Sequence, residues 1–390
     1  MSNSSTSNYA ASHSSLLLSS KRFEQSPFAD RYIDDSMLFG LYSNRFYPLS
    51  DGKDVVENYW HLRKAAALYD VPEKPLDIKG PDAVKFLERI FTRKIDDLKI
   101  WRARYAIACA PNGGIIMDGV LIRLAQDHFW YVHADGDFEQ WLLAFQDEYD
   151  VVVSDPGSRV LQIQGPLSLD LLRNIASGVP DNFGYFHAGF FDFDGQQLLV
   201  TRTGWTGELG FEIYPTADSD HLRLWDYLIS QGGQVNLKIA SLDSMGIRRL
   251  EAGILDYGTD MDRTMTPFQA GLGGFVDFGK TDFIGKKVLS KVDQKTLLMG
   301  LITDESIPFA GLSVVKGYQV VGSLTAGAWS PGLNKGIGYV RFLAASECQS
   351  DQLELINRDG SRSPCSIVKL PFFDPLKEIP RGISKASFDT

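Results

Sequence analysis

A glycine-rich run from Thr201 to Tyr214 holds the densest group of side chains that could bind a ligand. Glycine lets a flat ligand approach the backbone closely, and a carboxylate such as Glu212 can accept two N–H groups of that ligand side by side. Phe211 and Ile213 alternate with Glu212, which predicts that the carboxylate faces away from the core. The local sequence also leaves open a glycine-rich turn with a solvated glutamate.

Asp118 is a second residue whose setting indicates chemistry. It lies in an apolar run with Ile115, Ile116 and Val120. A carboxylate among such residues must be paired, or must face a cavity in which its charge is used. We therefore expect Asp118 to be a candidate catalytic acid, and a carboxylate at a turn or sheet edge is the alternative.

Two further motifs give weaker signals. Asp256, Asp260 and Asp262 crowd one turn, but their spacing does not match a calcium loop, so we expect a solvated acidic turn. The stretch from Gly274 to Thr281 fits a phosphate-binding loop letter by letter, yet Asp277 and two phenylalanines inside it oppose that role. No GxGxxG follows an expected strand, which disfavours nucleotide cofactors.

The sequence contains no pattern typical of a metal site or a disulfide framework. The six histidines show no HxxxH or HxH spacing, and the three cysteines are widely spaced with no CxxC. We therefore expect no metal and a reducing, cytoplasmic location.

Composition and charge restrict the class of protein. Apolar residues make up 44% and charged residues 23% of the chain, as in ordinary globular proteins. A net charge of −10 repels a phosphate backbone, so we expect no nucleic-acid partner. The longest unbroken apolar run, 105–110, is far shorter than the roughly 18 residues of a membrane span, so we expect a soluble protein without a membrane partner.

Two hairpins and a repeat are expected to position these residues. The pair Asn112 and Gly113 predicts a hairpin that carries Asp118 on its returning strand. Residues 76–81 and 161–166 form an internal sequence repeat with a period of 85 residues. Each copy predicts an alternating strand and a Gly-Pro turn before an amphipathic helix. The repeat implies two related α+β halves.

The chain ends in a different pattern, with short β-rich runs from Leu297 to Leu370 that predict a small barrel. The first twenty residues contain nine serines and no charged side chain, which predicts a disordered tail. The domain boundaries that we expect are a tail over 1–20, a first α+β domain from 21–73 and 159–249, a second α+β domain from 74–158 and 250–287, and a C-terminal β-barrel domain over 288–382.

In this order, the motifs resemble the folate-binding aminomethyltransferase family, whose founding member is the T-protein of the glycine cleavage system. The resemblance runs from about Arg22 to Gly382. Its markers are Tyr105 and Asp118 around two glycines, GWTGELGFE from Gly204, RLEAG from Arg249 and TDMD from Thr259. It implies an α+β fold in which two related, interleaved domains and a C-terminal β-barrel form a three-domain ring around tetrahydrofolate.

The resemblance also implies roles for single residues. Glu212 resembles the carboxylate that binds the pterin ring, and Asp118 resembles the catalytic acid beside folate N5. Tyr105 is implied both in catalysis and, with Trp205, in lining the folate pocket. Glu208 matches a motif position that we also assign to the cofactor site. Phe275 completes the cofactor-binding set, and the three aromatic residues are candidates to surround a cationic donor.

Two differences from the T-protein sequence bear on the identity of the one-carbon donor. Met245 stands where the T-protein has an arginine, and Gly274 followed by Phe275 stands where it has a tryptophan. The opening segment from Arg22 is more similar to the dimethylsulfoniopropionate demethylase branch. We therefore expect a tetrahydrofolate-dependent methyltransferase that takes a methyl group from a small sulfonium such as dimethylsulfoniopropionate, or from a methylated amine. The alternatives are a T-protein aminomethyltransferase, which needs a lipoyl carrier protein, and a non-catalytic folate-binding accessory protein.

Overall fold

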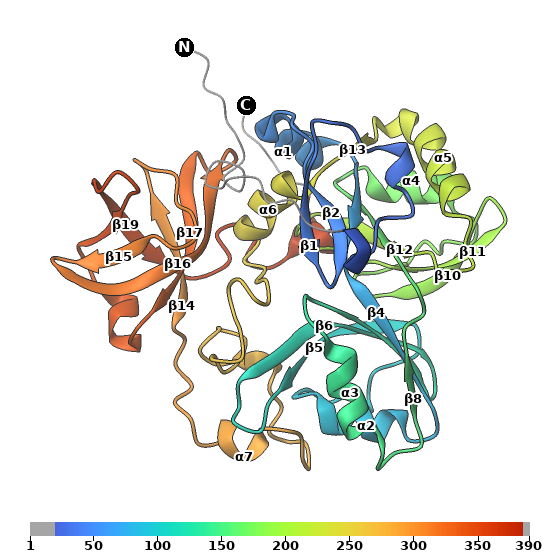
Figure 1. Ribbon diagram of the computed structural model, residues 1–390, viewed down its shortest axis with the longest axis horizontal. Coiled ribbons are helices and arrows are strands. Elements are labelled where there is room, and N and C mark those ends of the chain that lie inside the picture. Colours follow the sequence, from blue (N-terminus) through green and yellow to red (C-terminus); the bar gives the residue numbers. More distant parts are fainter. Residues whose placement is uncertain (1–19, 385–390) are drawn as a thin grey trace.

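The computed structural model of the chain describes residues 20–384, which form two β-sheets with helices and a separate closed barrel. In Figure 1 the barrel lies to the left, the six-stranded sheet at the upper right and the five-stranded sheet below it. Apart from Ser20, the predicted disordered tail over 1–20 lies outside the described residues.

The six-stranded sheet is mixed and is covered on both faces. Its strands, in spatial order, are β10 (Ala188–Phe193), β11 (Gln196–Thr201), β12 (Gly210–Tyr214), β9 (Val160–Gln164), β3 (Ala67–Val71) and β13 (Lys238–Ile239). Apolar residues of α4 (Ser168–Ile175) and α5 (His221–Gly232) share one core with this sheet. Residues of α1 (Val55–Lys64) and α6 (Leu242–Glu251) belong to a second core with the other face.

The five-stranded sheet is antiparallel, and the spatial order of its strands repeats that of the first five strands of the six-stranded sheet. It runs β5 (Arg102–Cys109), β6 (Ile115–Ala125), β7 (His128–His133), β4 (Lys74–Lys79) and β8 (Val152–Ser154). The helices α2 (Ala83–Ile90) and α3 (Phe138–Gln146) pack their apolar residues against it. Asn112 and Gly113 lie in the turn between β5 and β6, as the sequence predicts.

The two halves exchange their leading strands. β3 directly precedes β4 in the chain but pairs with β9, whereas β8 directly precedes β9 but pairs with β4. The pairing of Tyr69 with Gln162 in one sheet is repeated, 85 residues apart, by the pairing of Ser154 with Asp77 in the other. Each half therefore completes the sheet of the other half, which ties the two together.

The repeated Gly-Pro turns have the same geometry in both halves. Gly80 and Gly165 have φ angles of 143° and 119°, a region that favours glycine. A Cβ atom would lie 2.3 Å from the carbonyl oxygen of Asp150 at Gly80 and 2.3 Å from that of Ala65 at Gly165. Both turns therefore require glycine for conformation and for space.

The barrel is closed by six strands: β14 (Leu298–Thr303), β17 (Lys335–Phe342), β16 (Gln319–Ser330), β15 (Ser313–Lys316), β18 (Leu353–Ile356) and β19 (Arg362–Val368). The sequence pattern missed β15, which is short and lies between two turns. α7 (Lys286–Leu289) precedes the barrel, and α8 (Glu378–Arg381) follows it.

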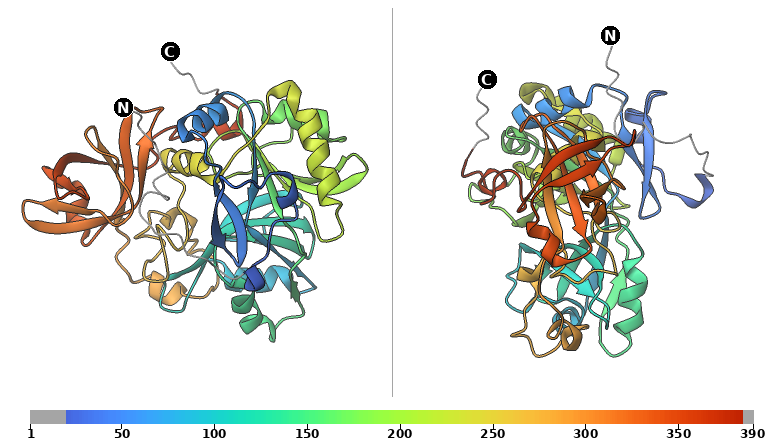
Figure 2. Two further views of the ribbon diagram at one scale, coloured as in Figure 1. Left: turned by 45° about the horizontal axis from the view of Figure 1, so that its top comes forward. Right: turned by 90° about the vertical axis from the view of Figure 1, so that its left-hand side faces the viewer.

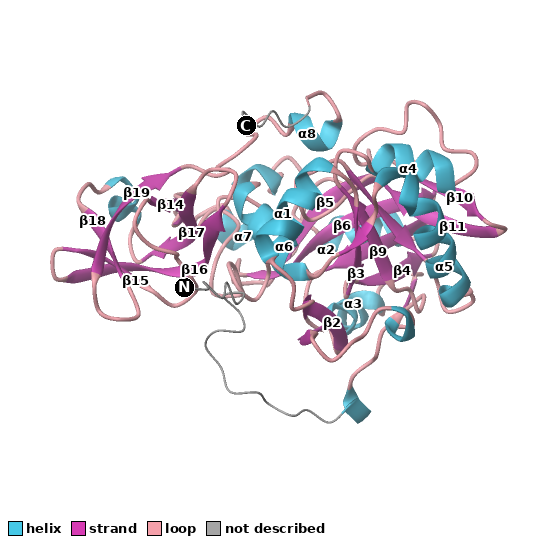
Figure 3. Ribbon diagram, turned by 90° about the horizontal axis from the view of Figure 1, so that it is seen from above, coloured by secondary structure: helices cyan, strands magenta, loops and turns pink. Residues whose placement is uncertain are grey.

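The expected α+β class with a C-terminal barrel is confirmed, whereas the domain boundaries themselves stay a prediction. Two small elements lie on opposite sides of the molecule, the hairpin of β1 (Leu38–Tyr42) with β2 (Arg45–Ser50), and α8. Figures 2 and 3 both show this separation. Among residues 20–384, no helix is long and apolar enough to span a membrane.

Candidate active site

A cavity of about 950 Å³ lies where the two sheets, α6 and the β1–β2 hairpin meet. The expected site residues that line it are Asp118, Tyr105, Glu212, Trp205 and Phe275. These five residues come from β5, β6, β12, the glycine-rich loop and the short 3-10 helix η4 (Gly273–Phe275), so the fold brings together positions that span 170 residues of the chain. Met245 of α6 also lines the cavity.

Asp118 and Tyr105 form a hydrogen-bonded pair on one wall. The Tyr105 hydroxyl donates to Oδ2 of Asp118 at 2.9 Å, because neighbouring antiparallel strands place both side chains on the same face. Asp118 is 8% exposed, and its Oδ1 atom is buried without a hydrogen-bond partner among the described residues. Burial raises the pKa of Asp118 to about 7, although the hydrogen bond from Tyr105 acts to lower it.

Aromatic rings and guanidinium groups line the cavity beside this pair. The rings of Tyr105 and Phe275 meet edge to face, with centroids 4.8 Å apart. The Arg93 guanidinium lies 5.5 Å from the Phe275 ring centroid, and that of Arg249 lies 4.9 Å from the Trp205 ring centroid. These contacts hold the rings in place around the cavity.

Glu212 lies on β12 at another part of the cavity wall, and several donors hold its carboxylate. Tyr214 donates a hydroxyl hydrogen bond to Oε2 at 2.7 Å, Gln162 donates to Oε1 at 2.8 Å, and Thr203 also donates to Oε2. Burial raises the pKa of Glu212, whereas the donors from Thr203, Tyr214 and Thr201 act to lower it. The carboxylate is thus fixed in direction and kept available for ionisation.

Glu73 is a second carboxylate at this end, which sequence reasoning missed. The Gln162 amide donates to it at 3.3 Å as well as to Glu212, and Oε2 of Glu73 is buried without a partner among the described residues. Burial and the charge of Glu212 raise the pKa of Glu73 to about 8. Glu73 therefore holds a proton at neutral pH, whereas the hydroxyl donors around Glu212 favour its ionised form.

The glycine-rich loop is held against β9 by one glutamine. Gln164 accepts a hydrogen bond from the Thr206 hydroxyl at 2.7 Å and donates to the carbonyl of Thr203 at 3.3 Å. A Cβ at Gly204 would lie 2.2 Å from the Gln164 amide nitrogen, so the loop approaches this closely only with glycine there. The loop carries Trp205 to the cavity.

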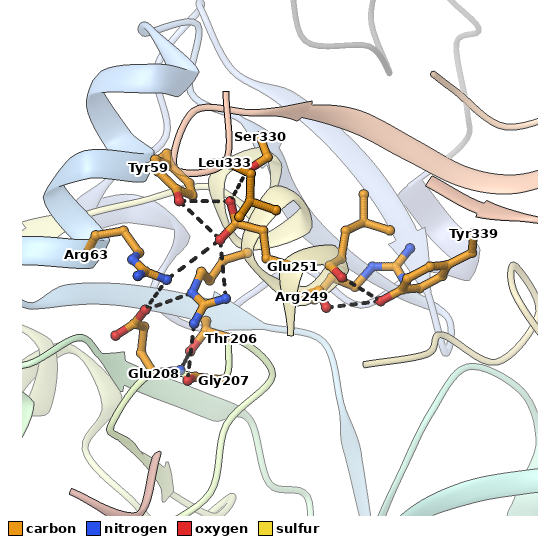
Figure 4. Close-up of polar contacts among 12 residues, drawn as sticks. Tyr59, Arg63, Thr206, Gly207, Glu208, Arg249, Glu251, Ser330, Leu333 and Tyr339 are labelled. Atoms are coloured by element: carbon orange, nitrogen blue, oxygen red, sulfur yellow. Dashed lines mark hydrogen bonds and ion pairs between the residues drawn. The ribbon is translucent and has the colours of Figure 1, made fainter. Parts of the chain in front are cut away.

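Glu208, which the sequence assigns to the cofactor site, lies outside the cavity lining. Its carboxylate accepts from Nε of Arg248 at 2.7 Å and pairs with Arg63 at 2.9 Å. Glu251 pairs with the same two arginines, which gives a buried network of two positive and two negative charges (Figure 4). The contacts of the Glu208 carboxylate are those of a buried ion-pair network, and its assignment to the cofactor site stays a prediction.

Glu251 joins this network to two other elements. It accepts hydrogen bonds from the Tyr59 hydroxyl of α1 at 2.8 Å and from Ser330 at the end of β16. Figure 4 shows these contacts around Glu251. The network therefore connects the glycine-rich loop, α1, α6 and the barrel.

The turn after α6 is not the solvated acidic turn that the sequence predicts. Asp260 is 1% exposed, pairs with Arg249 and accepts from Thr325 of the barrel at 2.7 Å. Asp256 lines the cavity, and burial raises its pKa to about 6. The buried cation of Arg249 draws the turn inward, an interaction that the spacing of the aspartates does not reveal.

The segment that matches a phosphate-binding loop, 274–281, has a structural role. The Lys280 ammonium donates to the carbonyl oxygens of Glu88, Phe91 and Arg93 and pairs with the Glu88 carboxylate. The lysine is therefore engaged with α2 and the chain that follows it. Within residues 20–384, no group of three or more His, Cys, Asp or Glu side chains is arranged to hold a metal ion.

Sequence reasoning did not assign three of the cavity residues to the site. Glu73 follows Pro72 at the junction of two strands that belong to different sheets, and Tyr42 comes from the β1–β2 hairpin. Asp256 lies between the apolar Leu255 and Tyr257, a setting like that of Asp118, which could have marked it. Their approach to the cavity depends on contacts between distant segments.

Comparisons with known proteins agree with this architecture. Residues 38–280 match the family model for the GCVT N-terminal domain, and residues 297–374 match that for the glycine cleavage T-protein C-terminal barrel domain. An aminomethyltransferase of Pseudothermotoga lettingae is 35% identical over 323 residues, which cover 80% of this chain and 88% of that protein. One of Halothermothrix orenii is 31% identical over 329 residues, which cover 82% and 91%.

A solved structure is similar over nearly the whole chain. The crystal structure of the glycine cleavage system aminomethyltransferase T from Bartonella henselae superposes with a TM-score of 0.79 at 25% identity. The match covers 90% of this chain and 98% of that one.

Proposed function

The chain belongs to the glycine cleavage T-protein family, and from that premise we propose that it transfers a one-carbon group from a positively charged donor to N5 of tetrahydrofolate. The observation that carries the proposal is the Tyr105–Asp118 pair, which lines the same cavity as Glu212 and in which the Oδ1 atom of Asp118 has no hydrogen-bond partner among the described residues. An enzyme of this family is a tetrahydrofolate-dependent one-carbon transferase.

The residues present fit the folate group. A pterin ring carries several N–H donors on one edge, and Glu212 supplies a buried carboxylate fixed by three hydroxyl groups and one amide. Trp205 and Phe275 supply flat apolar surfaces in the same cavity. When bound, tetrahydrofolate supplies N5 as the nucleophile that accepts the one-carbon group.

Asp118 has the properties of a group that holds a proton near neutral pH. Its pKa of about 7 matches the pH at which a general base is most effective. Tyr105 orients the carboxylate through Oδ2, so Oδ1 is the atom at which a proton released during transfer can be held. The same negative charge stabilises positive charge that develops beside it.

Two donor classes are consistent with such a site. The first is an aminomethyl group on a lipoyl carrier protein, which is supported by the name aminomethyltransferase of the relatives in Pseudothermotoga lettingae and Halothermothrix orenii. This donor requires a carrier protein as partner.

The second donor is the methyl group of a small sulfonium or methylated amine, with dimethylsulfoniopropionate as one example. It is supported by Met245 and Phe275, which give the cavity apolar walls where the family resemblance implies an arginine and a tryptophan. An onium group leaves as a neutral thioether or amine, so no acid is required to protonate it.

Mass spectrometry of the folate products tests both donors. The full chain is incubated with tetrahydrofolate and either an aminomethylated lipoyl carrier or a panel of sulfonium, betaine and methylamine donors. We expect 5,10-methylenetetrahydrofolate with the carrier if the first donor is right, and 5-methyltetrahydrofolate with one onium donor if the second is right. Folate binding without either product would favour a non-catalytic accessory protein and overturn the proposal.

A further inference from the structure

The end of the cavity beneath the β1–β2 hairpin is negatively charged. Asp118, Asp256 and Glu73 line it together with Tyr42. Burial raises the pKa of Tyr42 well above its usual value, and the charges of Asp256, Glu73, Asp118 and Asp135 raise it further. All four groups that raise this pKa are carboxylates. Because Glu73 holds a proton at neutral pH, the negative charge near Tyr42 comes from Asp256, Asp118 and Asp135.

The opposite end of the cavity is positively charged. Lys377 and Arg381 of the α8 segment line it, and neither side chain forms an ion pair within residues 20–384. The charges of Arg381 and Arg202 act to lower the pKa of Tyr185, which burial raises to about 12. Because the hairpin and α8 lie on opposite sides of the molecule in Figures 2 and 3, the two charged ends are well separated.

Asp118 and Asp256 both have capacity for a further partner. Asp118 is more than nine-tenths buried, and its Oδ1 atom has no hydrogen-bond partner among the described residues. Asp256 accepts one hydrogen bond, from Thr259 to Oδ2 at 2.9 Å, and the nearby charge of Arg249 acts to lower its pKa without a direct ion pair within the described part of the chain. Its charge acts to raise the pKa of Asp118, which is the direction expected when two carboxylates repel each other.

The chemistry of this end fits an organic cation. A cation between the two carboxylates removes their repulsion and offsets the cost of their burial. The rings of Tyr42 and Tyr47 lie nearly perpendicular with centroids 6.4 Å apart, and aromatic faces attract onium and ammonium groups. These residues supply too few ligands for a metal ion, in agreement with the absence of any metal-binding group in residues 20–384.

We propose that Asp256 is the specificity-determining residue that recognises the positively charged group of the one-carbon donor, beside the free oxygen of Asp118 and the ring of Tyr42. This inference rests on the proposed function, because it names what that site selects in its donor. It assigns a separate role to each carboxylate, since Asp118 holds the proton and Asp256 selects charge.

Two probes of equal shape and different charge test the inference. Choline and 3,3-dimethylbutan-1-ol differ in a quaternary nitrogen that replaces a carbon atom, and calorimetry measures the affinity of the full chain for each, with and without 5-formyltetrahydrofolate. We expect choline to bind at least about tenfold more tightly than the neutral alcohol. Equal affinity for the two probes would overturn the inference without any variant.

Three variants locate the effect. Asp256→Asn should lose most of the preference for choline, Asp256→Glu should keep it, and Asp262→Asn should also keep it. Asp262 is a matched control because it lies on the same turn, pairs with Arg341 at 3.8 Å and does not line the cavity. An equal loss in the Asp262 variant, or no loss in Asp256→Asn, would contradict the role of Asp256.

Binding of 5-formyltetrahydrofolate separates this inference from the proposed function. Failure of the wild-type chain to bind it refutes the folate site, whereas folate binding without a charge preference refutes the role of Asp256 alone. Unchanged folate affinity in Asp256→Asn also verifies that the variant is folded.

Discussion

The Tyr105 hydroxyl donates a 2.9 Å hydrogen bond to one oxygen of Asp118 and leaves the other oxygen without a partner among the described residues. This asymmetry gives the carboxylate a fixed orientation and one available lone-pair atom. It also explains why burial raises the pKa of Asp118 to about 7 and not further, because the donated hydrogen bond favours the ionised form.

The variant Asp118→Asn should lower turnover by about a hundredfold or more, because an amide cannot hold the released proton or stabilise developing positive charge. Affinity for 5-formyltetrahydrofolate should change by less than about threefold, since Glu212 supplies the main polar contact to the pterin. Single-turnover kinetics and calorimetry measure the two quantities. Unchanged turnover would remove Asp118 from the reaction.

The rate should rise with pH and reach a plateau above about 7, because Asp118 acts in its ionised form. Tyr105→Phe removes the hydrogen bond that lowers the pKa of Asp118, so the midpoint of the profile should move to higher pH. Tyr257→Phe, which lacks a hydrogen bond to Asp118, should leave the midpoint in place. The measurement is kcat/KM against pH, and a midpoint unchanged in Tyr105→Phe would contradict the assignment.

Glu212→Gln should weaken binding of 5-formyltetrahydrofolate by about 10- to 100-fold, because hydrogen bonds to a charged acceptor contribute roughly 1.5 to 3 kcal/mol each. Calorimetry measures the affinity. Asp192→Asn is the matched control, since this carboxylate lies in the same sheet on β10 and does not line the cavity. An affinity within threefold of the wild type in Glu212→Gln would show that the pterin is held elsewhere.

Local sequence patterns predicted the repeat and the two hairpins, because each depends on residues close in the chain. The repeat with a period of 85 residues contains the turn at Gly80 and its counterpart at Gly165, and both form as expected. The exchange of β3 and β8 between the sheets could not be derived from local patterns, since 67–71 and 152–154 share little sequence and pair with distant strands. Only the interleaved domains that the family resemblance implies anticipate it.

The sequence also marked part of the candidate site. Asp118 and Glu212 are marked by polarity within apolar strands, and the family resemblance assigned their roles. Glu208 has the same local signal, yet Arg63 and Arg248 engage it in the interior. Asp256 was interpreted as solvated because the burial of its turn depends on Arg249 of α6 and on the barrel.

Glu73→Gln should stabilise the chain relative to wild type, and the gain should grow between pH 5 and pH 8. The pKa of Glu73 is raised from 4.5 to about 8, so folding takes up a proton in this range and wild-type stability falls as pH rises. The amide needs no proton, and for this shift we expect the gain to be about 3 kcal/mol larger at pH 8 than at pH 5. Urea denaturation at both pH values measures it, with the exposed Glu57→Gln as control. A gain independent of pH would contradict the assigned protonation.

Glu251→Gln should destabilise the chain by about 3 kcal/mol, because it leaves Arg63 and Arg248 with one buried carboxylate between them. Glu354→Gln is the control, since it breaks a partly exposed pair with Arg362 on the barrel and should cost less than about 1 kcal/mol. Urea denaturation measures both. Because Glu208 of the same network lies on the glycine-rich loop, folate affinity should also fall in Glu251→Gln. Loss of stability without loss of affinity would mean that the network supports the fold but does not position the loop.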